Sequence, residues 1–391
     1  MENTNTLRGR EMGILKLVLV DRDADYVHSL LDYLISQHRH RFQISYYTEE
    51  AAIDHFLKEE ENTKSFDLIV SGSEFYETIK AQRQDQGVVI LLADQQDLLK
   101  YPLARSVKKY QYGDSFVTEI MQILAEESTT SFSPVKIQEH SSKTKVIGIY
   151  SPVGGVGKTT IAIGACVQSA WEGKKVFYLN LENAATTPLY FRGQQEKNLA
   201  NVLYYLQSNT KNLSLQIEAA KCADPLYQIE YFQPPDSIID FNEDISQELC
   251  LLLKELKASQ QYERIFLDFS TEINKNNLTL WQACDALVLV AKKDLTSLIK
   301  LKSLEKELRL LHSKAEGLEL LAKFNLVINK ATPDVMNMTK EFNLPELNFN
   351  KKGIVARIPL VENLVTVQNG VYLLDLNSAF GKAIHQLLRN F

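Results

Sequence analysis

Residues 151–160 read SPVGGVGKTT, and this stretch decides which fold is expected for the larger part of the chain. An apolar segment at residues 146–150 precedes it, and a helical pattern at residues 158–171 follows it. A glycine-rich loop between a strand and a helix lets backbone N–H groups surround a phosphate at the positive end of the helix. The sequence therefore predicts a phosphate-binding loop.

The residue types in this loop assign a role to several positions. Lys158 can reach the β- and γ-phosphates of a nucleotide, and the hydroxyl of Thr159 can ligate Mg²⁺. The strict pattern G-x-x-x-x-G-K-[ST] is not met, because Pro152 stands where the first glycine belongs. ATP and Mg²⁺ are the expected cofactors. The residues expected to contact the nucleotide are Gly154, Gly155, Val156, Gly157, Lys158, Thr159 and Thr160.

Two further predicted strands end in polar residues that we expect beside the loop. The apolar run at residues 264–268 ends in Asp268, which would hold Mg²⁺ together with Thr159. The run at residues 175–179 leads to Asn180 and Glu182. We expect Glu182 to orient the attacking water or to bind water on Mg²⁺, and Asn180 to help position these groups. Lys158, Asn180 and Glu182 are therefore the expected catalytic residues.

The adenine base is expected near the last predicted strand, residues 324–329, which ends in Asn329. The amide of Asn329 can donate to and accept from the N6/N7 edge of adenine. Pro359 lies in a later apolar segment and is expected to line the base pocket. The alternative interpretation is that Asn329 only ends a strand in a turn.

Composition excludes several classes of protein. The chain has 391 residues, of which 45% are hydrophobic and 24% charged, as in a soluble protein of about two domains. The net charge of −6 gives no strong case for nucleic acid. The four dispersed cysteines argue against a zinc site, an iron–sulfur cluster and a disulfide framework. No apolar run reaches the roughly 18 residues of a membrane span, and the polar N-terminus lacks a signal-peptide core, so we expect a cytoplasmic protein.

Strand and helix patterns alternate along the chain, which predicts an α/β protein with two doubly wound domains and mostly parallel sheets. A stretch rich in Ser and Thr predicts a linker at residues 127–144, between domains at 13–126 and 145–391, with a disordered tail at 1–12. Other expected strands are 14–20, 42–47, 66–70, 88–92 and 286–291, and other expected helices are 51–58, 115–125, 244–259, 295–312 and 378–389.

Together these motifs resemble the ParA/MinD-type P-loop ATPases. The family's loop reads K-G-G-x-G-K-T, whereas residues 153–159 read VGGVGKT. Val153 thus replaces the family lysine that reaches across an ATP-sandwich dimer. The family's D-x-D in the first switch becomes Asn180-Leu181-Glu182, while Asp268 matches. The resemblance implies nucleotide binding through Lys158, a homodimer, and slow ATP hydrolysis if any.

The N-terminal block resembles a response-regulator receiver of flavodoxin-like fold, in a degenerate form. Receivers carry paired acids after the first strand, but here Asp21 is followed by arginine and Asp23 is one position late. Residues 71–73 read SGS where the phosphoacceptor aspartate is expected. Lys108 or Lys109 matches the receiver lysine. The resemblance implies an atypical, non-phosphorylatable module for docking or localisation.

The order of domains and one further segment resemble the TadZ/CpaE branch, which places the machinery for Flp (Tad) pilus assembly at a cell pole. In that segment, residues 228–256, Pro234-Pro235-Asp236 precedes an acidic turn and a Leu-rich helix. The resemblance implies three partners or places: a second copy of the chain, the pilus machinery or a polar landmark protein, and a cell pole or the inner face of the membrane.

Three alternatives stay open. A ParA-like DNA-partitioning role would use the lysines of residues 292–309, but interspersed acids such as Glu305 favour a solvated helix face. A MinD-like peripheral membrane contact would use the apolar face of residues 378–391, although docking on the protein's own sheet is favoured. The third is a scaffold that binds nucleotide without hydrolysing it, which Val153 favours. An electron-carrier role is excluded by the cysteine positions.

Overall fold

The computed structural model describes residues 10–11, 14–38, 41–58, 66–83, 87–127, 132–133, 144–193, 195–208, 212–237, 244–311, 316–332 and 353–391. Most of the expected tail and linker lies outside these residues. The described parts, Arg10–Glu11 (β1) and Phe132–Ser133 (β7), pair in parallel. The chain forms two compact units: residues 1–138, 194–196 and 207–220 make the first, and the remaining residues make the second.

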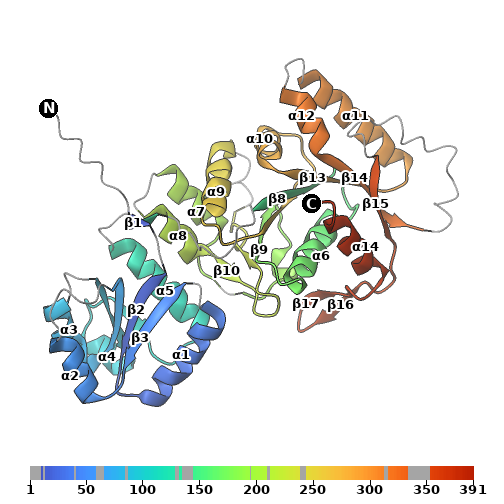
Figure 1. Cartoon of the computed structure of the whole chain (residues 1–391). Helices are drawn as coiled ribbons and strands as arrows, with labels where there is room; N and C mark the ends of the chain where they lie inside the picture. The colour runs from blue at the N-terminus through green and yellow to red at the C-terminus, as the bar shows by residue number, and fades with distance from the viewer. Residues whose placement is uncertain are drawn as a thin grey trace, which may run out of the picture. The chain divides into compact units, whose positions relative to one another are not determined.

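The first unit has a five-stranded parallel sheet in the order β3-β2-β4-β5-β6. In chain order this is second, first, third, fourth, fifth, the flavodoxin-like doubly wound arrangement. The helices flank the sheet (Figure 1). The strands are β2 Leu15–Val20, β3 Phe42–Tyr47, β4 Leu68–Gly72, β5 Val88–Ala93 and β6 Ser106–Lys108, and the helices are α1 Ala24–His38, α2 Glu50–Lys58, α3 Ser73–Arg83, α4 Gln95–Lys100 and α5 Gly113–Glu127.

Helix α8, Leu213–Ala220, belongs to the first unit although it follows the phosphate-binding loop in the sequence. Its side chains Leu215 and Ala219 enter the same apolar cluster as the buried face of α5. Glu218 of α8 lies 3.7 Å from the guanidinium of Arg41, and both side chains are buried. The fold of the first unit therefore uses a helix that is distant in sequence.

The second unit has an eight-stranded sheet in the order β10-β11-β9-β12-β8-β13-β14-β15. All neighbouring strands are parallel except β10 and β11. Buried Val, Ile, Leu and Phe fill the central strands, as expected for a sheet covered on both faces. The strands are β8 Lys145–Tyr150, β9 Val176–Leu181, β10 Cys222–Ala223, β11 Glu230–Tyr231, β12 Arg264–Phe269, β13 Ala286–Ala291, β14 Phe324–Ala331 and β15 Ile354–Pro359, with a separate hairpin of β16 Val365–Gln368 and β17 Val371–Leu374.

Helices cover this sheet, and the C-terminal helix α14 packs against α6 and β15. Its apolar residues Phe380, Ile384 and Leu387 are buried in the core. The expectation that this face docks on the protein itself is confirmed. No helix within the described residues is long and apolar enough to cross a bilayer. The helices are α6 Lys158–Trp171, α7 Leu199–Gln207, α9 Ser246–Ala258, α10 Lys275–Ala283, α11 Leu295–Leu311, α12 Glu316–Lys323 and α14 Ala379–Leu388, with a 3₁₀ turn, η1, at Thr187–Leu189.

The predicted α/β class with parallel sheets is confirmed, and α6 and β13 begin and end where the sequence predicts. One expectation about the sheet was wrong. We predict residues 324–329 as its last strand, but β14 continues to Ala331 and β15 pairs along it. The register of the pairing between β14 and β15 shifts twice. These shifts weaken the alternation of apolar and polar residues by which β15 could have been recognised in the sequence.

Candidate nucleotide-binding site

The loop between β8 and α6 has the backbone that phosphate binding requires. Gly155 and Gly157 have φ angles of +67° and +96°, in the left-handed region that glycine adopts without strain. Gly157 is the N-cap of α6, so the free N–H groups of the first helical turn start here. These groups and the helix dipole favour an anion at this point.

Gly157 is also required by close packing. A Cβ atom at this position would lie 2.5 Å from Nδ2 of Asn329. Asn329, on β14, donates its Nδ2 hydrogen to the carbonyl oxygen of Val156 at 2.7 Å. The loop is therefore held to the end of β14 by a side chain that is 173 positions away in the sequence.

We expect Gly157→Ala to destabilise the second unit by about 2–4 kcal/mol, because it combines a strained φ with a clash against Asn329. Gly173→Ala is the matched control, since Gly173 has a φ of +79° but open space around its Cβ position. It isolates the backbone strain of about 1–2 kcal/mol. Urea unfolding measures both. Equal losses in the two variants would show that the contact with Asn329 contributes nothing.

Lys158 is held at the base of the loop by an acid on the neighbouring segment. Its side chain is 6% exposed, and its Nζ atom lies 3.3 Å from Oε1 of Glu182, two residues along from Asn180. The structure therefore brings together the lysine and the acid that the sequence selected as catalytic. An anion at the loop would compete with Glu182 for this ammonium group.

Asp268, at the end of β12, is fully buried below the loop. Burial raises the pKa of its carboxyl group to about 7, and the charge of Glu182 adds to the increase, while the hydroxyls of Thr159 and Tyr178 oppose it. Oδ2 accepts a hydrogen bond from the hydroxyl of Tyr178 at 3.0 Å. Oδ1 is buried and has no hydrogen-bond partner among the described residues.

This buried oxygen fits a divalent cation. Carboxylate and hydroxyl oxygens are the ligands that Mg²⁺ prefers, and it takes few of them directly from protein, with water and phosphates completing the shell. Asp268 and Thr159 supply such a pair, and their proximity is shown by the effect of the Thr159 hydroxyl on the pKa of Asp268. Among the described residues, no group of three or more His, Cys, Asp or Glu side chains could hold a metal ion.

Tyr178 is the residue of this site that the sequence analysis missed. Its hydroxyl donates to Asp268 and accepts from Nδ2 of Asn180 at 3.1 Å. Oδ1 of Asn180 in turn accepts the backbone N–H of Glu182 at 2.8 Å. The chain of bonds fixes where Glu182 lies. The sequence could have indicated this role, because residues 178 and 180 are two positions apart on a strand and therefore lie on the same face of the sheet.

Pro359, the other residue expected near the base, ends β15 and pairs with Ala331 of β14. It therefore lies on the strand next to the one that carries Asn329. Contacts of Asn329 and Pro359 with adenine stay predictions. The position of Asn329 has a structural consequence of its own, since its amide N–H is directed to the loop.

Val153 stands where the ParA/MinD-type loop has a lysine, and its side chain points into the core. It is 8% exposed and belongs to the apolar cluster that the central strands form with α6 and α14. Its backbone N–H donates to the hydroxyl of Ser151 at 3.1 Å. From this position the side chain does not reach beyond the loop.

The first unit contains a smaller polar cluster at the carboxyl edge of its sheet. Lys109 lies 3.0 Å from Asp21 and 3.3 Å from Asp23, so it is Lys109 that faces the acids. Asp23 also accepts a hydrogen bond from the hydroxyl of Tyr110 at 2.7 Å. A Cβ atom at Gly72 would lie 2.7 Å from Oδ2 of Asp21. A larger side chain at position 72 would thus collide with the acid.

Comparison with known proteins finds a family model and similar folds for the second unit. Residues 144–320, less than half of the chain, match the family model described as AAA domain. Curated proteins gave no match. Solved structures with a similar fold include MinD from Aquifex aeolicus (20% identity, 63% of this chain and 96% of that chain, TM-score 0.48), a putative plasmid partition protein from Borrelia burgdorferi bound to AMPPNP (19%, 63% and 98%, 0.48) and a ParA family ATPase from Chlorobium tepidum (17%, 64% and 93%, 0.46).

Proposed function

We propose that the second unit binds ATP with Mg²⁺ and that the chain acts as a positioning or assembly factor whose state depends on this nucleotide. The observation that carries the proposal is the arrangement around the loop. The buried Lys158 and the buried Asp268, with its unpartnered oxygen, converge on a left-handed glycine loop at a helix N-terminus. Glu182 compensates the charge of Lys158 in the free protein, but the ionised carboxylate of Asp268 is costly to bury unless a cation compensates it.

Each residue has a defined task in this proposal. The N–H groups of the loop and Lys158 bind the phosphates, and Lys158 exchanges its contact with Glu182 for them. Asp268 and Thr159 would hold Mg²⁺, which supplies charge neutralisation between the phosphates. Glu182, released from Lys158 and held in place through Asn180, orients the water. Tyr178 keeps the carboxylate of Asp268 aimed at the loop.

The proposed turnover is slow, and the nucleotide serves chiefly to join two copies of the chain. The support is Val153, whose buried side chain leaves no cation at the place where the ParA/MinD-type loop carries one. An arginine or lysine that stabilises the transferred phosphate contributes several orders of magnitude to the rate in phosphoryl transfer. A scaffold that binds ATP without hydrolysing it is the second candidate, favoured by the same observation.

Val153→Lys is expected to destabilise the second unit by about 2–4 kcal/mol without raising the rate of ATP hydrolysis, because the position faces the core and an ammonium group would be buried there. Val153→Met is the control for side-chain size without charge. Thermal unfolding and phosphate release measure the two effects. Faster hydrolysis at unchanged stability would contradict the inward orientation of residue 153.

We further propose that the chain serves a Tad (Flp) pilus system at a cell pole, in contact with the pilus machinery or a polar landmark protein. The order of the two units and the resemblance of residues 228–256 to the TadZ/CpaE branch support this role. MinD- or ParA-like positioning of a septum, flagellum or DNA is the alternative. A fluorescent fusion in the native cell tests the choice: polar foci that disappear with the pilus genes support the pilus role.

The first unit is proposed to be a receiver-like docking module that cannot be phosphorylated. Its support is the carboxyl end of β4, where Ser71 and Gly72 stand and Gly72 packs against Asp21. Incubation with acetyl phosphate followed by intact-mass analysis is expected to show no added phosphoryl group. Phosphorylation of an aspartate in this unit would refute the proposal.

The dimer is tested by light scattering of the full chain with ATP and Mg²⁺, with ADP, and without nucleotide. We expect the mass of a dimer with ATP and of a monomer without nucleotide. Phosphate release measured on the same samples separates the two candidates, since the scaffold dimerises without turnover. Failure to bind ATP would refute both.

A further inference from the structure

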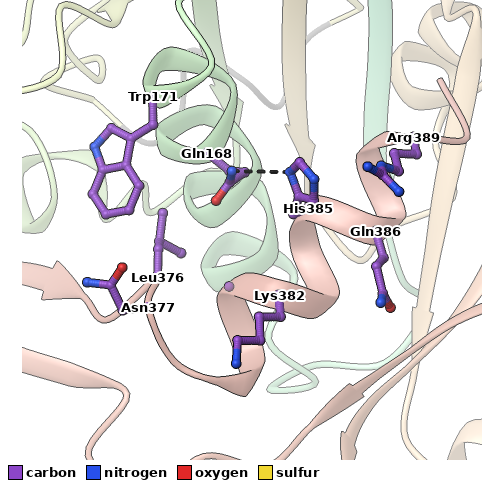
Figure 2. A pocket seen from close by; sticks show the side chains of 9 residues that line it. Gln168, Trp171, Leu376, Asn377, Lys382, His385, Gln386 and Arg389 are labelled. Atoms are coloured by element: carbon purple, nitrogen blue, oxygen red, sulfur yellow. Dashed lines mark hydrogen bonds between the residues drawn. The ribbon is translucent and has the colours of Figure 1, made fainter.

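A cavity of about 480 Å³ lies in the second unit between the C-terminal half of α6 and the helix α14 (Figure 2). Its size falls within the range of roughly 300–1,000 Å³ of ligand sites. At about 1.5 Å per residue along α6, its lining residues Gln168 and Trp171 are about 15–20 Å from the phosphate-binding loop. It is therefore separate from the nucleotide site.

One side of this cavity is apolar and consists of the exposed Trp171 and of Leu376, which is 5% exposed. Trp171, at the end of α6, is 53% exposed, although a tryptophan normally buries most of its surface. Leu376 lies beside it, across from the side chains of α14 (Figure 2). An exposed indole in a concave site is a typical anchor for a partner side chain.

The other side, formed by α14, is cationic. Lys382 and Arg389 line it together with His385, and the lining residues include no carboxylate. Glu172, which follows Trp171, is already engaged, because Nδ1 of His385 lies 2.9 Å from it and a guanidinium nitrogen of Arg264 lies 3.7 Å from it. The cavity therefore presents positive charge to a ligand.

The spacing of the two cations selects the kind of ligand. Lys382 and Arg389 are two helical turns apart, or about 10 Å along α14. A single phosphate or carboxylate cannot contact both. An extended peptide in the polyproline II conformation has three residues per turn and rises about 3.1 Å per residue, so two acidic residues three positions apart share one face at a matching distance. Gln386, between the two cations, can donate to a peptide carbonyl.

The site is preformed, because α14 is fixed on its opposite side. Ile384 and Leu387 are buried in the core, and the guanidinium of Arg264 donates to the carbonyl oxygen of Leu388 at 3.3 Å. Gln168 of α6 lies 3.4 Å from His385, as the dashed line in Figure 2 shows. Binding would thus require little ordering of the helix.

We propose that this cavity binds an extended acidic segment of a partner protein. Two carboxylates three residues apart pair with Lys382 and Arg389, and an apolar side chain between them packs on Trp171. A protein fits better than a nucleic acid, because two cations and a net charge of −6 give little attraction for a polyphosphate chain. The inference goes beyond nucleotide binding and does not depend on it.

Tryptophan fluorescence of the full chain tests the proposal directly. The chain has two tryptophans, and Trp281 is 0% exposed, so a ligand in the cavity changes mainly the emission of Trp171. The probe is the acetylated and amidated peptide Ser-Glu-Phe-Ala-Glu-Ser. We expect a saturable change with a Kd between about 10 µM and 1 mM, weaker at high salt. The same peptide with Gln in place of Glu should not bind.

Substitutions in the cavity and on a distant helix test where the peptide binds. The double variant Lys382→Glu and Arg389→Glu is expected to weaken binding at least about tenfold, since two charge pairs become repulsive. Lys300→Glu with Lys306→Glu on the exposed face of α11 makes the same change in net charge elsewhere and should leave the Kd within about twofold. Circular dichroism confirms that both variants fold.

Three results would overturn the proposal. The first is the absence of a saturable signal with the acidic peptide at 5 mM, roughly the weakest affinity that still counts as binding. The second is an equal effect of the two double variants, which would show nonspecific attraction. The third is displacement of the peptide by a single-stranded oligonucleotide of equal charge at a lower concentration, which would assign the cavity to nucleic acid.

Discussion

Lys158→Ala is expected to lower the affinity for ATP by about 100-fold or more while leaving the fold intact. A charge-assisted hydrogen bond contributes about 1.5–3 kcal/mol, and Lys158 is placed to form two of them with the β- and γ-phosphates. The released partner, Glu182, is 26% exposed, so water can solvate it in the variant. The loss of affinity should therefore be large and the loss of stability small.

Isothermal titration with ATP and Mg²⁺ measures this effect, and urea unfolding without nucleotide checks the fold. Lys300→Ala, which removes an exposed lysine from α11, is the control and should bind as the wild type does. If the Lys158→Ala protein kept its affinity within about threefold, the loop would not contact phosphates through this lysine.

Asp268→Asn is expected to have opposite effects on stability and on Mg²⁺-dependent binding. In the metal-free protein, the pKa of this buried carboxyl group is about 7, above the ordinary value of 3.8. The folded state favours the protonated carboxyl group. The stability that this group contributes is fully present below a pH of about 3.8 and is lost as the pH rises through about 7. Replacing it with a neutral side chain should raise the free energy of unfolding by roughly 1–3 kcal/mol at pH 8 and much less at pH 5.

The same substitution removes the carboxylate that would hold Mg²⁺. We expect the addition of Mg²⁺ to strengthen ATP binding at least about tenfold in the wild type and not in the variant. Urea unfolding in EDTA at the two pH values and titration of ATP with and without Mg²⁺ measure both effects. Glu307→Gln, at an exposed position of α11, is the charge control. A variant that is destabilised at pH 8, or that still responds to Mg²⁺, contradicts the assignment.

The sequence predicts those parts of the site that depend on neighbouring residues. The strand, the glycines, Lys158 and the following helix all lie within residues 145–171. The left-handed φ angles require glycine, so the pattern can be recognised in the sequence. Asp268 is recognisable because an apolar strand ends there. The structure brings Lys158 and Glu182 together because both follow strands that end at the same edge of a parallel sheet.

The remainder depends on contacts between distant segments. The hydrogen bond from Asn329 on β14 to the carbonyl oxygen of Val156 joins two segments that are far apart in the sequence. Neither an asparagine nor a valine alone indicates such a bond. Tyr178 looks like any buried aromatic residue until Asp268 is placed beside it. Helix α8 has an apolar pattern that suits either unit, so its packing against the first unit could not be read from the sequence.

The most direct test of the central claim is equilibrium binding of ATP to the wild-type full chain in the presence of Mg²⁺. We expect one site per chain with a Kd of about 100 µM or tighter, and a Kd weaker by about 100-fold or more when Lys158 is replaced by Ala. Wild-type protein that is folded and binds no ATP at millimolar concentration would contradict the account.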